Sequence, residues 1–229
     1  MPPPATIYGH LASAVGEWLD PASLQFAYMF SFAAKGDDLE HQHIVSPHPP
    51  QRLSHEESAL LKDWRRRNEL VAAGSVQPTI REFLFQAELT LYVQPASLAL
   101  ALRQPAFPVA LGRSQDLASI LSVEEVDLEE AVGAYLERTL LPFAWRGRTA
   151  FGTTVIMPRF IGPPPERQAS FAQYIVLNRR VYAGDAQVDV SDRARVVRQA
   201  HPERWLVDPD SPAYSGVRRG IVFLSFVGE

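Results

Sequence analysis

The hydrophobic pattern at the start of the chain changes from a helical to a strand-like period. After a run of prolines, residues 4–16 place Ile7, Leu11 and Val15 on one helical face. Residues 24–34 then alternate, with aromatic side chains at every second position. The pattern therefore predicts a helix followed by a strand that has one strongly apolar face.

The next segment predicts an excursion away from the core. Residues 35–53 are polar and contain several prolines, which is typical of a loop. Ser54 then opens a helix with Glu57 three residues later, a capping box, and Gly74 marks its end. We expect a loop followed by a helix between the first strand and the next one.

The middle of the chain returns to alternating periods. Residues 79–93 alternate and predict a long strand, and residues 95–103 predict a short helix that begins with a proline. A further strand is expected at residues 120–128, and a helical stretch at residues 129–141.

Beyond Pro142 the pattern changes to short apolar segments separated by glycine and proline. We expect strands at residues 153–160, 174–177 and 221–227. The chain is therefore predicted to have a mixed domain over residues 1–141 and a smaller β-rich region over residues 142–229.

Charge and composition narrow the class of protein. The chain has 22 basic and 26 acidic residues, a net charge of −4, and no cysteine. Residues 1–130 hold 9 basic and 17 acidic side chains, whereas residues 131–229 hold 13 and 9. Without cysteine there is no disulfide, thiolate zinc ligand or cysteine nucleophile. No apolar run is long enough to span a bilayer, so we expect a cytoplasmic protein without membrane contact.

Two short motifs are candidate binding features, and the first of them is suited to a phosphate. In the first, an apolar stretch is broken by Gly112, Arg113 and Ser114. Glycine frees the backbone there, arginine offers a fixed fork of donors and serine adds a hydroxyl. In the second, Gly9 and neighbouring small residues keep one stripe of the first helix narrow, which lets a backbone approach closely.

Basic side chains gather on one side of the helix expected after Ser54. Lys62, Arg65 and Arg66 lie together there, opposite an apolar side. This face is either a solvated surface or an RNA contact, and the sequence leaves both interpretations open.

A histidine cluster carries the main enzymatic alternatives. His41 and His43 alternate on an extended segment, so together with Asp37 or His48 they could chelate zinc or manganese in a metal-dependent hydrolase. Tyr28 and His43 could instead act as general acid and base in metal-free RNA cleavage. A solvated segment is the simpler reading, and we assign neither a metal nor a catalytic residue.

The predicted order of elements suggests a fold. Helix, strand, excursion, strand, helix and strand indicate an α+β chain, and they are what remains of a ferredoxin-like (RRM-like) βαββαβ unit without its first strand. The proline-led helix, the strand containing Arg81-Glu82-Phe83-Leu84 and the Pro108–Ser114 turn resemble, in this order, those of one family. It is the fifth-named Cas protein family of type I CRISPR effector complexes, within the RAMP superfamily.

This resemblance implies a non-catalytic subunit that grips the 5′ handle of a CRISPR RNA (crRNA) in a Cascade-like surveillance complex. It implies contacts with the backbone and large subunits, an indirect role toward target DNA, and a thumb at residues 35–78. It implies no cofactor. By the same resemblance, RNA-binding roles carry over to Tyr8, Gly9, Arg81, Gly112, Arg113 and Ser114, with Lys62, Arg65 and Arg66 as thumb candidates.

Two departures from the family pattern matter. Some relatives cut precursor crRNA, so a processing endoribonuclease is the alternative function. No His-Lys pair lies near the glycine turn here, and we therefore do not carry catalysis over to this chain. In the family a central strand precedes the proline run, whereas here only Met1 and Pro2 do. We expect the strand to be encoded upstream or, as the second choice, to be replaced by residues 220–227.

Overall fold

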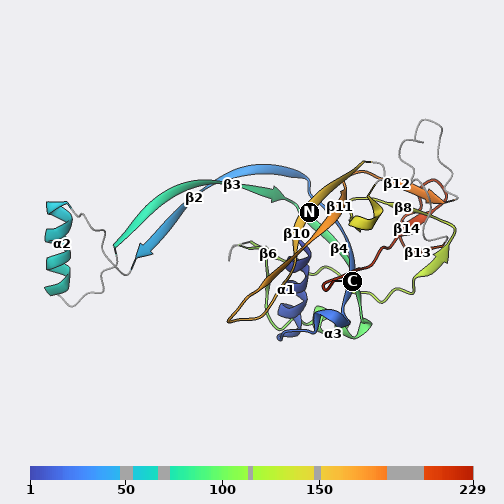
Figure 1. The fold of residues 1–229 in the computed structure, drawn as a ribbon, viewed down its shortest axis with the longest axis horizontal. Coiled ribbons are helices and arrows are strands. Elements are labelled where there is room, and N and C mark those ends of the chain that lie inside the picture. The colour runs from blue at the N-terminus through green and yellow to red at the C-terminus, as the bar shows by residue number, and fades with distance from the viewer. Residues whose placement is uncertain (47–53, 67–72, 113–115, 147–150, 185–203, 229) are drawn as a thin grey trace. The chain divides into compact units, whose positions relative to one another are not determined.

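The computed structural model describes residues 1–46, 54–66, 73–112, 116–146, 151–184 and 204–228. The chain divides into two compact units, which are treated separately below. Unit 1 consists of Met1–Ser31 and Glu88–Glu229, and unit 2 is the inserted segment Phe32–Ala87 (Figure 1). The boundary expected between residues 141 and 142 lies inside unit 1. With 46% strand and 19% helix, the α+β class is confirmed.

Unit 1 contains most of the regular structure. Its helical elements are α1 (Pro4–Val15), η1 (Pro21–Ser23), η2 (Ala96–Leu98), α3 (Ala99–Arg103) and η3 (Phe143–Trp145). Its strands are β1 (Gln25–Ser31), β4 (Glu88–Gln94), β5 (Val109–Ala110), β6 (Leu117–Ala118), β7 (Glu129–Ala131), β8 (Gly133–Leu136), β9 (Leu140–Pro142), β10 (Gly152–Ile161), β11 (Ala169–Leu177), β12 (Val181–Gly184), β13 (Trp205–Asp208), β14 (Arg218–Gly220) and β15 (Leu224–Ser225). Unit 2 contains β2 (Ala34–Ser46), α2 (His55–Arg66) and β3 (Ala73–Phe85).

The first helix forms where the sequence predicts it. Pro4 occupies the first helical turn, where its missing N–H costs nothing, and Gly16 ends the helix with a φ of 90°. The face that contains Ile7 and Leu11 is buried. The helix therefore begins and ends at residue types that favour those positions. Its apolar face points into unit 1.

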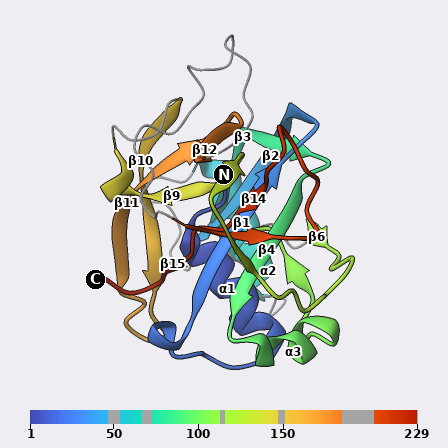
Figure 2. The ribbon, with the colours of Figure 1, turned by 90° about the vertical axis from the view of Figure 1, so that its right-hand side faces the viewer.

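The central sheet of unit 1 has three antiparallel strands in the order β15-β1-β4 (Figure 2). β1 and β4 pair without interruption from Gln25↔Gln94 to Ser31↔Glu88. On the other side of β1, Phe26 pairs with Leu224 of β15. The late segment expected as the second choice thus joins the sheet, but beside β1. Among the described residues, no strand pairs with the second edge of β4.

The three strands expected to share one sheet do not do so. β6, just before the third of them, pairs with β5 in a separate two-stranded sheet. Residues 120–128 form no strand, and Leu121 is 91% exposed. The long strand expected at residues 79–93 is broken at Gln86, whose φ of 50° ends β3 before β4 begins. A complete ferredoxin-like sheet is therefore not formed by these segments.

The helix expected at residues 129–141 is wrong, because this segment forms β7, β8 and β9. Tyr135 and Leu136 are both buried, since β8 lies between β12 and β14 and has core on both faces. A strand buried on both faces has a continuous apolar run instead of an alternation. Its period cannot be told from that of a buried helix, which explains the error.

Two further sheets complete unit 1. β10, β11 and β9 form an antiparallel sheet in the order β10-β11-β9, and β12, β8, β14, β13 and β7 form a five-stranded sheet in that order. β14 and β8 pair in parallel, while the other pairs of this sheet are antiparallel. The strands expected at residues 153–160 and 174–177 are confirmed within β10 and β11.

Two main clusters form the core. The first joins α1, β1, β10 and β11 with the end of the chain, and its largest members are Tyr8, Phe26, Tyr28 and Phe226. The second surrounds Trp205 and is built from β8, β9, β11, β12 and β13. β11 contributes alternate residues to both clusters, so it separates them as a shared wall.

A buried polar network ties β4 to β13 and β14. The Tyr92 hydroxyl donates to Asp208 Oδ2 over 2.5 Å and accepts from Arg219 Nη1 over 2.9 Å. Burial raises the pKa of Tyr92, and the hydrogen bond to Asp208 raises it further, so the hydroxyl stays protonated and remains a donor. Asp208 also accepts from the backbone N–H of Asp210 at 2.9 Å.

Unit 2 is a hairpin with a helix between its strands. β2 and β3 pair continuously from Ala34↔Phe85 to Ser46↔Ala73. The loop expected at residues 35–53 is therefore a strand as far as Ser46, because β3 supplies a partner for its backbone, and residues 47–53 lie outside the described residues. The helix expected to reach Gly74 is α2, and Gly74 itself belongs to β3. No helix in the described part of the chain is long and apolar enough to cross a membrane.

Removal of one buried ring tests the first core cluster. Phe226 is fully buried and stacks on Phe26 with ring centroids 4.3 Å apart. Phe226→Ala should lower the free energy of unfolding by about 3 to 5 kcal/mol, because the cavity adds to the lost transfer free energy. Urea unfolding measures it. Leu100→Ala, at a side chain that is 68% exposed, is the control, and equal losses for both variants would contradict the packing described.

Candidate RNA-binding site

The site expected in unit 1 is built on contacts between α1 and the segment before the glycine turn. The backbone N–H of Ala106 donates to Ala14 O over 2.8 Å. One turn earlier in α1, the ring of His10 lies beside the backbone of Ala110 in β5. The helix and the β5–β6 hairpin are therefore held side by side.

The glycine turn has a conformation that requires glycine. Gly112 has a φ of 102°, which other residues rarely adopt. The backbone N–H of Leu111 donates to Asp116 O over 2.7 Å and closes the turn between β5 and β6. Among the described residues other than its chain neighbours, no heavy atom lies within 4 Å of the position that a Cβ of Gly112 would take, and Gly112 is exposed. Arg113 and Ser114 lie outside the described residues.

Gly9 lies on the exposed edge of the neighbouring helix. Apart from the backbone of α1 itself and the chain neighbours, no heavy atom of the described residues lies within 4 Å of the position of an added Cβ there. It is adjacent to His10, which contacts β5, so the structure brings the small-residue edge of α1 close to the hairpin that carries Gly112. The backbone of a bound ligand could approach both glycines from solvent.

An open groove lies at the base of the same hairpin. Its volume is about 420 Å³, and it is lined by residues 102–103, 105, 108–109 and 118–123. Arg103 contributes the charge of the lining, and its Nε and Nη2 donate to Val123 O at 3.2 and 3.1 Å, which fixes the guanidinium. A groove of this size can hold a nucleotide-sized ligand, and its apolar lining suits the face of a base.

Tyr8 does not belong to this surface. Its side chain is 2% exposed, and its hydroxyl donates to Leu19 O over 2.6 Å. Its ring packs edge-on against Phe160 and Phe226, with centroids 4.8 and 5.5 Å away. Burial raises its pKa. Tyr8 falls on the buried face of α1 beside Ile7 and Leu11, which gives it a structural role and explains why it is not presented to a ligand.

Sequence reasoning missed His10 and the groove. A single histidine on a helix gives no signal of its own, because its role comes from the β5 backbone, which lies a hundred residues further along the chain. Residues 120–123 of the groove belong to the strand expected at residues 120–128, so the sequence does not predict their exposure.

The other expected RNA contacts lie in unit 2. Arg81 is in the middle of β3, where its Nε lies 2.8 Å from Glu40 Oε2 across the hairpin. Its side chain is 47% exposed, so the guanidinium keeps donors that face solvent. Lys62 is exposed on α2. Arg65 and Arg66 belong to the backbone of α2, and their side chains lie outside the described residues.

The residues of the enzymatic alternatives are distributed differently from a reactive centre. Tyr28 is 1% exposed and its hydroxyl donates to Pro2 O over 2.5 Å. Burial raises its pKa, so it is a poor general acid at neutral pH. His41 and His43 are exposed on the same face of β2, while His48 lies outside the described residues. The part of the chain that the structure describes holds no group of three or more side chains arranged to bind a metal.

The comparisons with known proteins add no family to this geometry. No protein-family model matches the sequence, and no curated protein matches it.

The contact of His10 predicts an acid-sensitive fold. Burial lowers the pKa of His10 more than its hydrogen bond to Ala110 raises it. The unfolded chain therefore binds a proton more readily. Stability should be complete above the unfolded pKa of about 6.5 and should fall as the pH drops through that value toward the lower folded pKa.

Urea unfolding at a series of pH values between about 5 and 8 measures this dependence. His10→Gln keeps a donor for Ala110 but cannot titrate, so its curve should be flatter between pH 7 and pH 5. If the variant keeps the full slope of the parent protein in this window, His10 is not the group responsible.

Proposed function

We propose that this chain is a non-catalytic RNA-binding subunit of a type I CRISPR surveillance complex, where it grips the 5′ handle of the crRNA. The observation that carries the proposal is the insertion of unit 2 between β1 and β4, two strands that pair directly with each other. The family that the sequence resembles has a thumb between the corresponding strands.

The α1–β5 contact supports the proposed grip on the handle. It holds Gly9 near the turn of Gly112, and both positions are open to solvent. A phosphate could bind the turn through backbone N–H groups and the side chains of Arg113 and Ser114, while the groove beside it takes an unstacked base. A single strand with splayed bases fits this arrangement better than a duplex does.

The exposed apolar residues of unit 2 support contacts with protein subunits. Leu39 and Ile80 pair across β2 and β3 and are 60% and 72% exposed. A two-stranded ribbon cannot bury such side chains by itself and is marginally stable alone. We assign this surface to the backbone or large subunit of the complex. Target DNA would be reached only indirectly, through the complex.

Loss of either proposed arginine should weaken binding of the handle. Arg81→Ala and Arg113→Ala should each reduce the binding free energy by about 1.5 to 3 kcal/mol, because a charge-assisted hydrogen bond to RNA is removed. Affinity should also fall as the salt concentration rises. Fluorescence anisotropy with a labelled handle RNA measures both effects.

Glu40→Gln is the matched control for Arg81. This variant removes the ion pair in β2–β3 but leaves the guanidinium in place. Its affinity should equal or exceed that of the parent chain, since Arg81 no longer has a competing carboxylate. A loss as large as that of Arg81→Ala would show that the effect comes from the hairpin and not from RNA.

The purified chain should not cut precursor RNA that contains the CRISPR repeat, the sequence from which the 5′ handle derives. We expect no specific product on denaturing gels with EDTA or with added manganese, because the Tyr28 hydroxyl is buried and engaged. Specific cleavage that His43→Ala abolishes would establish the processing endoribonuclease instead. Cleavage that requires manganese would establish the metal-dependent hydrolase.

A further inference from the structure

The β10–β11 hairpin has a basic environment within an acidic chain. Residues 138–184 contain seven arginines and a single acidic residue, Glu166, although the whole chain has a net charge of −4. Arg180 is paired with Glu137 at 2.8 Å. Arg146, Arg167 and Arg179 are exposed, and among the described residues no carboxylate forms an ion pair with them.

One face of this hairpin is packed, and the other is open along β10 and at the start of β11, whereas Ile175 and Leu177 near the end of β11 are buried in the second core cluster. The inner side chains of β10 and β11, among them Val155 and Tyr174, pack in the first core cluster. On the outer face Ile156 is 68% exposed and Phe171 is 62% exposed. Since Ile156 pairs with Gln173 and Pro158 with Phe171, the two exposed apolar side chains are diagonal neighbours. They form an apolar strip with an aromatic ring in it.

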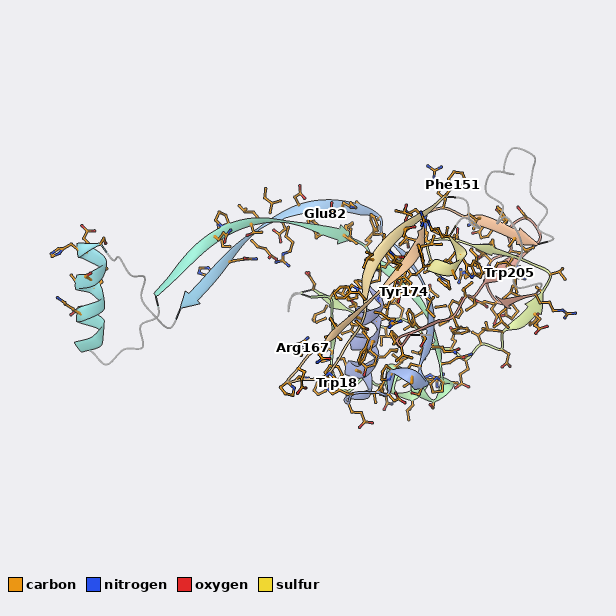
Figure 3. The ribbon with its side chains drawn as sticks, viewed as in Figure 1. Trp18, Glu82, Phe151, Arg167, Tyr174 and Trp205 are labelled. Carbon is orange, nitrogen blue, oxygen red and sulfur yellow. The ribbon has the colours of Figure 1, made fainter. Side chains whose placement is uncertain are left out.

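Each end of the hairpin presents a further candidate contact (Figure 3). Phe151, just before β10, is 46% exposed, and the guanidinium carbon of Arg179 lies 5.5 Å from its ring centroid. Arg167 is exposed in the connection between β10 and β11. The hairpin therefore offers a ring beside a cation at one end, and a second ring close to a cation at the other end.

The backbone at both ends is unfavourable for the residues found there. Phe151 has a φ of 61° and Arg167 a φ of 45°, a region in which a side chain costs about 1 to 2 kcal/mol and glycine costs almost nothing. Stability alone would favour glycine at these two positions. The side chains that occupy them are a phenylalanine and an arginine, the types that stack on bases and bind phosphates.

We propose that the exposed surface of this hairpin, from Phe151 and Arg179 along the outer face of β10 past Phe171 to Arg167, binds single-stranded nucleic acid. Arginines that form no ion pair with any described carboxylate complement the phosphates, and exposed rings stack on bases without reading their sequence. A ten-residue strand rises about 33 Å, enough for several nucleotides. None of these residues belongs to the proposed handle site, so this surface does not depend on the proposed function.

Glycine substitutions separate a binding role from a structural one. Phe151→Gly and Arg167→Gly relieve the backbone, so the melting temperature should stay equal or rise. Phe151→Gly should nevertheless weaken binding about fivefold or more, as expected for a lost stacking contact. Ser215→Gly, whose parent residue has a φ of 50° outside this surface, is the matched control and should leave affinity unchanged.

The assay uses the full chain carrying both Arg81→Ala and Arg113→Ala, so that neither arginine of the proposed handle site contributes to its result. Fluorescence anisotropy is measured with a mixed-sequence RNA of about ten nucleotides, with DNA of the same sequence, and with the DNA duplex. Tighter binding of RNA or of single-stranded DNA identifies the strand that this surface takes. Equal binding of the duplex would overturn the proposal.

Substitutions within the strip complete the test. Phe171→Ala should weaken binding about fivefold or more, and Phe171→Tyr should retain it because the ring remains. Arg179→Gln should reduce the slope of log affinity against log salt by about 1, whereas Arg204→Gln, just before β13, should not. Unchanged affinity and slope in Phe151→Gly, Phe171→Ala and Arg179→Gln would overturn the proposal.

Discussion

The stacking of Phe226 on Phe26 is the interaction on which the rest of unit 1 depends. It joins a side chain near the end of the chain to β1, and Tyr8 covers both the edge of Phe226 and that of Phe160. α1, β1 and β10 therefore meet at one aromatic cluster. Because one face of each of these elements packs in this cluster, only its other face can contact solvent or a ligand.

The polar network around Tyr92 fixes the position of β4, as the aromatic cluster fixes that of β1. Asp208 and Arg219 are nearly buried, so each depends on the Tyr92 hydroxyl for a hydrogen bond that water cannot supply. β1 and β4 are the two strands from which unit 2 begins and to which it returns. The insertion thus leaves unit 1 at a pair of strands that are fixed independently, one by rings and one by a charged network.

The sequence predicts those elements whose period follows from a single buried face, such as α1 and β10. It fails at residues 129–141, where β8 is buried on both sides, and at residues 35–46, where β3 makes a strand of a polar segment. Gly112 was found because its conformation requires glycine. His10 and Phe171 were not, since the significance of each comes from neighbours, or from a lack of them, that only the folded chain reveals.

The unbroken register of β2 and β3 restricts how the length of the hairpin of unit 2 can vary. Side chains alternate between its faces, so adding or removing one residue per strand would exchange the face of Leu39 and Ile80 with that of Glu40 and Arg81. Two residues per strand would preserve the faces and change the reach by about 7 Å. Length variation in this hairpin is thus restricted to even steps if both surfaces are to be kept.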